Sequence, residues 1–384
     1  MNSFERYEAI LNGQKPDKMP FYFPTIACSV ASEILGRDVD SGGDSLHFKE
    51  ELSLFYGKAA HDEFVERYLE NAVELNRKLG ADIIRQTWRS RGQPSKKIDD
   101  NTLLFGDENG QHIIKKYFPE YQSYGVVENT YKTRDAEDLL EQFENELKNS
   151  NSDNTVTNED LELVYKDQLK LQEMSAKYFP TIVVALGIGF SMDNVTLLEA
   201  SVMDPDLLGE FFKFQAKSTV SHIKFLSEKG FKVLLGGTDI ATNTGSMISP
   251  ICFDKIFSPI LTIYANECAK YGINYCYRTD GNAWQIADIM FKKCGVQAYG
   301  EVDRIASMNV GRLREKYPEL IIIGNVGSAT LVNGTEAQVR AETKASLEES
   351  GGTRYIPGPS NAIVHGSPVK NVYAMIEEID RYKP

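Results

Sequence analysis

The fold is decided by a series of short apolar runs in the second half of the chain. The runs are PTIVVALG (180–187), KVLLGG (232–237), NYCYRT (274–279), QAYGEV (297–302), LIIIGNV (320–326) and TRYIPG (353–358). They do not alternate apolar with polar residues, which is typical of parallel strands buried on both faces of a sheet. Segments with helical spacing separate the runs, so the pattern predicts repeated strand–helix units.

Two further strand-like runs, FYFPT (21–25) and DIIRQ (82–86), lie nearer the start of the chain. With them the chain has eight strand–helix units, which favours an α/β fold of the closed (β/α)8 TIM-barrel class. An open doubly wound sheet is the alternative. We expect one barrel domain over residues 1–384, with additional helices near the N-terminus at residues 3–11, 48–59 and 61–79.

Two segments interrupt the strand–helix order. Residues 102–118, TLLFGDENGQHIIKKYF, place an Asp-Glu-Asn-Gly turn between two strand-like runs, which predicts an inserted β-hairpin. Residues 149–160, NSNSDNTVTNED, are polar with a single valine, and we expect a flexible loop there.

Composition restricts the class of protein. Of 384 residues, 42 are Lys or Arg and 55 are Asp or Glu, so the formal charge is −13. No basic run is present, which argues against nucleic-acid and anionic-membrane partners. The five cysteines are scattered, and no stretch reaches about 18 apolar residues. We therefore expect a cytoplasmic protein, and the sequence leaves a homo-oligomer open.

Charged residues follow three consecutive predicted strands. Asp239, Asp280 and Glu301 each come just after such a run, and Arg278 closes the middle one. Because strand ends gather at one rim of a barrel, we expect these four side chains to meet and to be the catalytic residues. Crowded carboxylates raise each other's pKa unless a cation intervenes, here Arg278 or a divalent metal. The alternative is that each carboxylate only caps the following helix.

Other residues at the expected rim are candidates for binding. Those assigned to the substrate are Tyr277, Asn282, Tyr299, Asn361 and Trp88. His365 is the one histidine that follows a predicted barrel strand, so a metal, if present, would use Asp280, Glu301 and His365. Dinucleotide, Walker, zinc-protease, C-x-x-C and G-x-S-x-G motifs are absent.

Several longer segments resemble one family. They are SFERYEAILNGQKPDKMPFYFP (3–24), GGTDIATNTGSMISPICFDKIFSPI (236–260), YRTDGNAWQIADIMFKKCGVQAYGEVD (277–303), IIGNVGSATLVNGTEAQVRAETK (322–344) and YIPGPSNAIVHGSPVKNVYAMIEE (355–378). Together they resemble the uroporphyrinogen decarboxylase-like superfamily. That resemblance implies the barrel and two functional classes, the decarboxylase of haem synthesis and methyltransferases that work with corrinoid proteins.

Departures from the family patterns select between these classes. The decarboxylase carries an arginine-rich segment that binds substrate carboxylates, whereas PFYFPTIACSVAS (20–32) has no arginine. Thiol-methylating members bind zinc through an H-x-C pair and a later cysteine. The matching positions here are Arg278-Thr279-Asp280 and Asn361, which cannot supply that set.

The resemblance therefore implies a methyltransferase that takes a methyl group from a small donor, such as an O-methyl aromatic compound, and passes it to cobalt. The corrinoid (cobalamin) would be carried by a partner protein, and zinc is left open. A leaving oxygen needs a proton or a Lewis acid. Asp280 and Glu301 are expected as acids or metal ligands, Arg278 as the electrostatic stabiliser and Asp239 as a substrate or metal partner. The alternatives are a decarboxylase, a methylcobamide-dependent methyltransferase to another acceptor, and a non-catalytic binding barrel.

Overall fold

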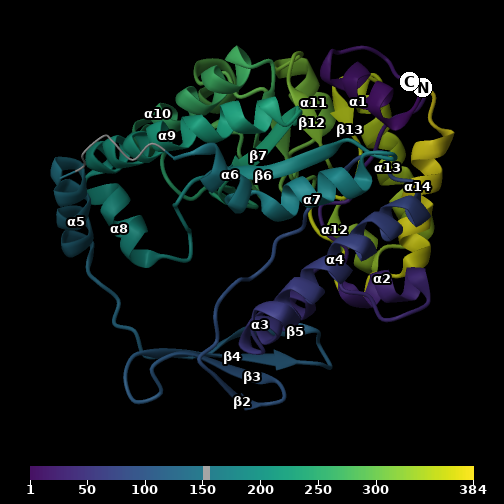
Figure 1. Ribbon diagram of the computed structural model, residues 1–384. Helices are drawn as coiled ribbons and strands as arrows, with labels where there is room; N and C mark the ends of the chain where they lie inside the picture. The colour runs from purple at the N-terminus through teal and green to yellow at the C-terminus, as the bar shows by residue number, and fades with distance from the viewer. Residues whose placement is uncertain (150–155) are drawn as a thin grey trace.

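A curved sheet of seven parallel strands forms the centre of the molecule (Figure 1). The computed structural model describes residues 1–149 and 156–384. In spatial order the strands are β1 (Ile84–Arg85), β6 (Thr181–Gly187), β7 (Val233–Gly237), β10 (Asn274–Arg278), β11 (Ala298–Gly300), β12 (Ile321–Ile323) and β13 (Tyr355–Ile356). Every neighbouring pair is parallel, as the unalternated apolar runs predict.

The run predicted as the first strand closes this sheet into a barrel. The backbone N–H groups of Asp82 and Ile83 donate to the carbonyl of Phe21, at 3.0 and 3.3 Å, and that of Tyr22 donates to the carbonyl of Pro357 at 3.4 Å. The segment thus lies between β1 and β13. It forms no regular ladder, because Pro20 and Pro24 have no N–H to donate. The predicted TIM-barrel class is confirmed, with one of its eight segments held by isolated bonds.

Helices follow the barrel strands and cover them. They are α8 (Val195–Met203), α9 (Pro205–Glu228), α10 (Pro250–Lys270), α11 (Val310–Lys316), α12 (Ser328–Asn333), α13 (Glu336–Ser350) and α14 (Val369–Arg381). Between β6 and β7 the chain forms two helices, α8 and α9, which are divided at Asp204, whose side chain caps α9. Between β10 and β11 the chain forms turns and a short π-helical stretch, Ile289–Lys293.

Four helices lie near the N-terminus, α1 (Ser3–Leu11), α2 (Cys28–Leu35), α3 (Asp44–Phe55) and α4 (Lys58–Leu79). The sequence patterns did not predict α2. No helix within the described residues is both long and apolar enough to cross a membrane.

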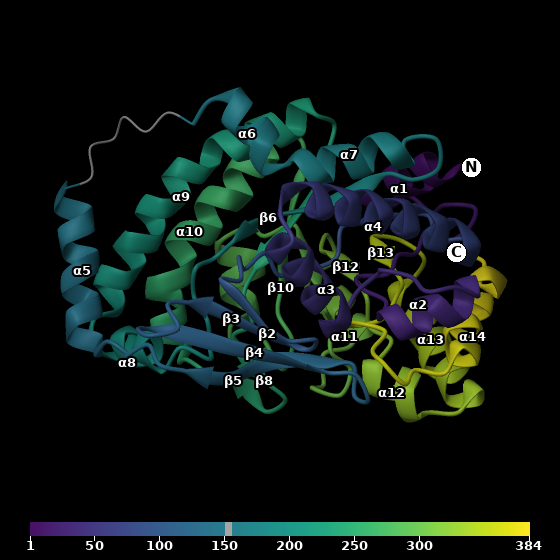
Figure 2. The ribbon, with the colours of Figure 1, turned by 60° about the horizontal axis from the view of Figure 1, so that its bottom comes forward.

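The inserted segment is larger than the predicted hairpin. Strands β2 (Lys96–Asp99), β3 (Thr102–Gly106), β4 (His112–Phe118) and β5 (Ser123–Asn129) form a four-stranded antiparallel sheet, in which β3 and β4 pair around the Asp107–Gly110 turn. The sheet follows β1, so it extends from the barrel face where strands end. When the lower side of Figure 1 is turned forward, the sheet lies in front of the barrel strands (Figure 2).

The chain returns from this sheet to β6 through α5 (Ala136–Asn149), α6 (Asn158–Val164) and α7 (Lys166–Ser175). Part of the loop predicted over 149–160, residues 150–155, lies outside the described residues. The rest of that segment includes the last residue of α5 and the first turn of α6, where Thr157 caps the helix.

Candidate active site

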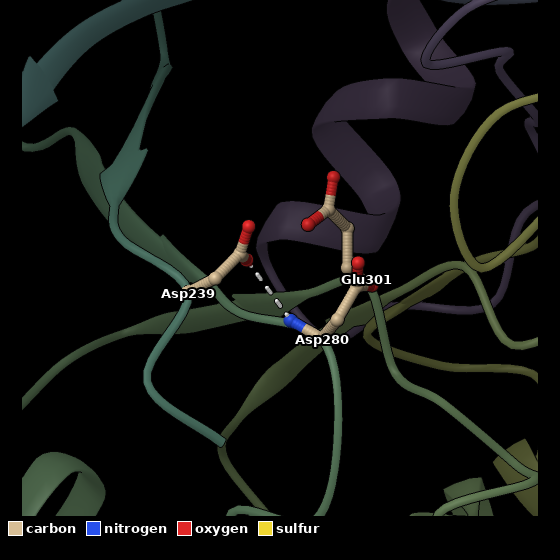
Figure 3. Close-up of side chains that lie close together, drawn as sticks. All are labelled: Asp239, Asp280 and Glu301. Atoms are coloured by element: carbon tan, nitrogen blue, oxygen red, sulfur yellow. Dashed lines mark hydrogen bonds between the residues drawn. The ribbon is translucent and has the colours of Figure 1, made fainter. Parts of the chain in front are cut away.

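Three carboxylates meet at the carboxyl ends of three neighbouring barrel strands. Asp239 follows β7, Asp280 follows β10 and Glu301 follows β11. One oxygen atom from each lies within 4.8 Å of the others (Figure 3). Asp239 is exposed, Asp280 is partly buried and Glu301 is only 3% exposed. The predicted meeting of these side chains therefore occurs in the structure, while their role stays a proposal.

The backbone of the carboxylate residues is fixed by a hydrogen bond between two loops and by one uncommon conformation. The N–H of Asp280 donates to Oδ1 of Asp239 at 3.2 Å, which fixes the two loops to each other. Glu301 has a φ of 60°, in the left-handed region that non-glycine residues rarely adopt. Such a conformation costs about 1–3 kcal/mol and is concentrated at functional sites.

Arg278 is the cation closest to the cluster. Its Nη2 donates to Oε2 of Glu301 at 2.6 Å, and its guanidinium lies over the ring of Trp88, 5.2 Å from the centroid. Burial opposes the charge of Arg278, but the charges of the neighbouring carboxylates outweigh burial and raise its pKa. Burial also raises the pKa of Glu301, and the ion pair with Arg278 only partly opposes that rise.

The pKa of Asp280 is shifted to near neutral pH. Burial, followed by the charges of Glu301 and Asp239, raises its pKa to about 7. A hydrogen bond from the Asn361 amide to Oδ2 of Asp280, at 2.8 Å, acts in the opposite direction because it favours the ionised form. Asp280 can therefore hold a proton and release it near neutral pH.

The remaining predicted binding residues lie around this cluster with different degrees of access. Tyr277 and Tyr299 are fully buried, and their hydroxyls donate to the backbone carbonyls of Thr238 (3.1 Å) and Thr279 (3.4 Å). Both support the loops that carry the carboxylates. Asn282 accepts a bond from the backbone N–H of Trp284 at 3.2 Å, so it orders the turn after β10.

His365 is not a member of the carboxylate group. Its Nδ1 lies 2.8 Å from Oγ of Ser29, on the segment after β13. The cluster thus offers only carboxylate oxygens, the ligands of hard cations, and one of them is already paired with Arg278. Zinc prefers nitrogen and sulfur donors, so this set fits zinc poorly.

The sequence analysis gave no role to one charged residue at the end of a barrel strand. Arg85, the last residue of β1, is 5% exposed, and its Nε donates to the carbonyl of Pro24 at 3.0 Å. Burial lowers its pKa, and its charge lowers the pKa of Glu301. Its position directly after Ile83 and Ile84 was the feature of the sequence that could have indicated a role at the strand end.

Comparison with protein families decides the classification. A family model described as uroporphyrinogen decarboxylase (URO-D) matches residues 183–382, more than half of the chain. The chain belongs to this family. The uroporphyrinogen decarboxylase-like superfamily indicated by the sequence motifs is thereby confirmed. Membership fixes the scaffold rather than the reaction, because one fold hosts many activities.

One solved structure shares the fold over nearly the whole chain. A methyltransferase from Methanosarcina mazei superposes with a TM-score of 0.63 at 17% identity, over 99% of this chain and 98% of that one. A putative vitamin-B12 independent methionine synthase from Listeria monocytogenes gives a TM-score of 0.42 at 12% identity, over 95% and 99% of the two chains. No match was found among curated protein sequences.

Proposed function

We propose that this protein is a methyltransferase that takes a methyl group from a small methyl donor, an O-methyl aromatic compound or similar, and delivers it to the cobalt of a corrinoid protein. The observation that carries the proposal is Asp280, a carboxylic acid with a pKa of about 7 beside a guanidinium at the barrel rim. The Methanosarcina mazei methyltransferase adds support as a barrel of the same fold.

The difficult part of this reaction is the departing oxygen. The reduced corrinoid, a second substrate brought by the partner protein, supplies the nucleophile. When the methyl–oxygen bond breaks, the electron pair stays on oxygen, and a proton must reach that oxygen for it to leave readily. Asp280 gives this proton and becomes a carboxylate, while the product leaves as a neutral phenol or alcohol.

The neighbours of Asp280 prepare it for this role. Glu301 and Asp239 repel a negative charge on Asp280 and so keep the proton in place before reaction. Arg278, although its Nη2 is held by Glu301, still contributes positive potential that stabilises negative charge on the departing oxygen. After proton transfer, the Asn361 amide bonds the new carboxylate. Asp239 is exposed, so the cluster is in contact with the water that returns the proton.

The charges of the site disfavour the family's decarboxylase reaction. A porphyrinogen with eight carboxylates needs several free cations. Here Arg278 is paired with Glu301, and Arg85 is buried with its Nε on the carbonyl of Pro24. The three carboxylates would repel such a substrate.

The test is an anaerobic assay with cob(I)alamin and a panel of methoxylated phenols. We expect methylcobalamin and the demethylated phenol to form together. Asp280→Asn should lower the rate by about 10²–10⁴-fold, the usual value of a positioned acid. Asp303→Asn, a matched change outside the cluster, should leave the rate within about twofold of wild type. Carbon dioxide release from an acid substrate, without methyl transfer, would favour the decarboxylase alternative.

A further inference from the structure

A cavity of about 320 Å³ lies between barrel loops and the inserted sheet, and we call it the side cavity. Four segments form its walls. They are the end of the first barrel segment (25–28), the start of α3 (42–45), the turn between β4 and β5 (121–123) and the segment after β13 (362–365). Barrel loops and the inserted sheet thus build it together.

Two short connections join the side cavity to the cluster. Ala362 lines the cavity and directly follows Asn361, whose amide donates to Asp280 at 2.8 Å. On another wall, the hydroxyl of Thr25 bonds the hydroxyl of Thr87. Thr87 directly precedes Trp88, on whose ring the Arg278 guanidinium lies. A ligand in this cavity would therefore lie close to Asp280.

The cavity walls carry no lysine or arginine. Asp44 is the one carboxylate among them, and its Oδ2 accepts the backbone N–H of Tyr124 at 3.1 Å. His365 is the one lining side chain able to carry a positive charge, and it bonds Ser29. The other polar groups are hydroxyls, an amide and a thiol. An anionic ligand would lose its hydration here with no lysine or arginine to pair with, and the nearby carboxylates would repel it.

The volume limits the size of a ligand. About 320 Å³ is the volume of roughly ten liquid waters and stands at the lower end of small-molecule pockets. A single aromatic ring with its substituents fits this volume, whereas a tetrapyrrole does not.

The inserted sheet contributes one wall through a constrained turn. Gln122, between β4 and β5, has a φ of 51°, in the region that favours glycine. Ser123 is exposed at the start of β5, and its side chain can be enlarged without disturbing the core. The inserted sheet is therefore in a position to determine which methyl donors enter the side cavity.

We propose that the side cavity binds the body of the methyl donor, and that it selects donors with at most one ring and without negative charge. This inference rests on the proposed methyl transfer and adds the substrate class. The inserted sheet, rather than the barrel alone, then determines specificity.

The test is calorimetric binding to the whole protein without corrinoid, using three probes: 2-methoxyphenol (uncharged), tetramethylammonium (cationic) and 4-methoxybenzoate (anionic). We expect at least one of the first two to bind about tenfold or more tightly than the benzoate. Ser123→Trp should fill the cavity and weaken that binding about tenfold or more. Val127→Trp, on the exposed part of the same strand, is the matched control and should bind as wild type does.

Several results would overturn the inference: equal or tighter binding of the benzoate, no binding of either other probe, or unchanged binding by Ser123→Trp. Thermal melting of each variant verifies that it is folded. Because the measurement needs no corrinoid, it is separate from the proposed reaction. If the probes bind as expected but no methyl transfer occurs, the proposed reaction is wrong and the proposed role of the side cavity is retained. Methyl transfer unaffected by Ser123→Trp rejects the side cavity alone.

Discussion

Asp280 is in an environment that opposes its own charge. Its pKa is about 7 in the folded protein, against 3.8 for an ordinary aspartate, because burial and two neighbouring carboxylates destabilise the ionised form. The same cause that makes it a proton donor at neutral pH also makes its ionisation unfavourable for folding. Function and stability are therefore opposed at this residue.

The first prediction concerns stability. Below pH 3.8 Asp280 is protonated in both the folded and the unfolded protein, and above about 7 it is ionised in both. Its contribution to the free energy of unfolding therefore becomes less favourable as the pH rises between these two values. Asp280→Asn should therefore raise the melting temperature at pH 8 and have little effect at pH 4. Thermal denaturation at the two pH values measures this. A lower melting temperature at pH 8 would contradict the electrostatic account.

The second prediction concerns Asn361, which positions Asp280 through the 2.8 Å bond to its carboxylate. Asn361→Leu keeps the size of the side chain but removes the donor that favours the ionised form, so the pKa of Asp280 should rise further. The fall in methyl-transfer rate with increasing pH should then begin at a higher pH. In the double variant with Asp280→Asn and Asn361→Leu, the methyl-transfer rate should no longer depend on pH. A merely structural role for Asn361 would lower the rate without moving the profile.

At the scale of elements, the close approach of β6 and β7 sets the shape of the rim. A Cβ on Gly236 would overlap the backbone carbonyl of Leu186, where the register of the two strands shifts. Gly236→Ala should therefore lower the free energy of unfolding by about 2 kcal/mol or more. Gly187→Ala, at the end of β6 with open space around it, should change it by less than about 0.5 kcal/mol. Urea unfolding of both variants measures these changes. Equal losses of stability in the two variants would contradict the packing argument.

The elements predicted from sequence are those with a strong local signal. Unalternated runs such as LIIIGNV (320–326) identified the barrel strands, and carboxylates after successive strands identified the cluster. The four-stranded inserted sheet was missed in part, because β2 and β5 are mostly exposed and carry no apolar alternation. The side cavity was not predictable, since segments distant in sequence meet there only through tertiary packing.

At the scale of the whole molecule, a buried glutamate ties the inserted sheet to the N-terminal helix α3. Glu51 of α3 is fully buried, and its two oxygens accept bonds from Lys115 (2.7 Å), the Tyr124 hydroxyl (2.6 Å) and the backbone N–H of Gly92 (3.2 Å). These partners come from the sheet and from the loop that leads to it. Glu51 therefore joins α3 to the inserted sheet, alongside the bonds of Asp44 to Tyr124 and of Ser45 to Tyr117.

Glu51→Leu should release this connection and leave Lys115 without its partner. We expect a loss of about 3 kcal/mol in the free energy of unfolding, typical of a broken buried ion pair. Limited proteolysis should then cut within 96–129 while the barrel stays intact. Glu128→Leu, which removes an exposed carboxylate of β5, is the control and should be cut at the wild-type rate. Equal resistance of Glu51→Leu would show that other contacts hold the sheet.

The most direct test of the account is the pH dependence of methyl transfer from 2-methoxyphenol to cob(I)alamin, measured with wild type and Asp280→Asn. If Asp280 supplies the proton to the departing oxygen, the wild-type rate falls as the pH rises through about 7, and the variant is slow at every pH. Rapid, pH-independent transfer by Asp280→Asn would contradict the central claim that this carboxylic acid releases the methyl group from its donor.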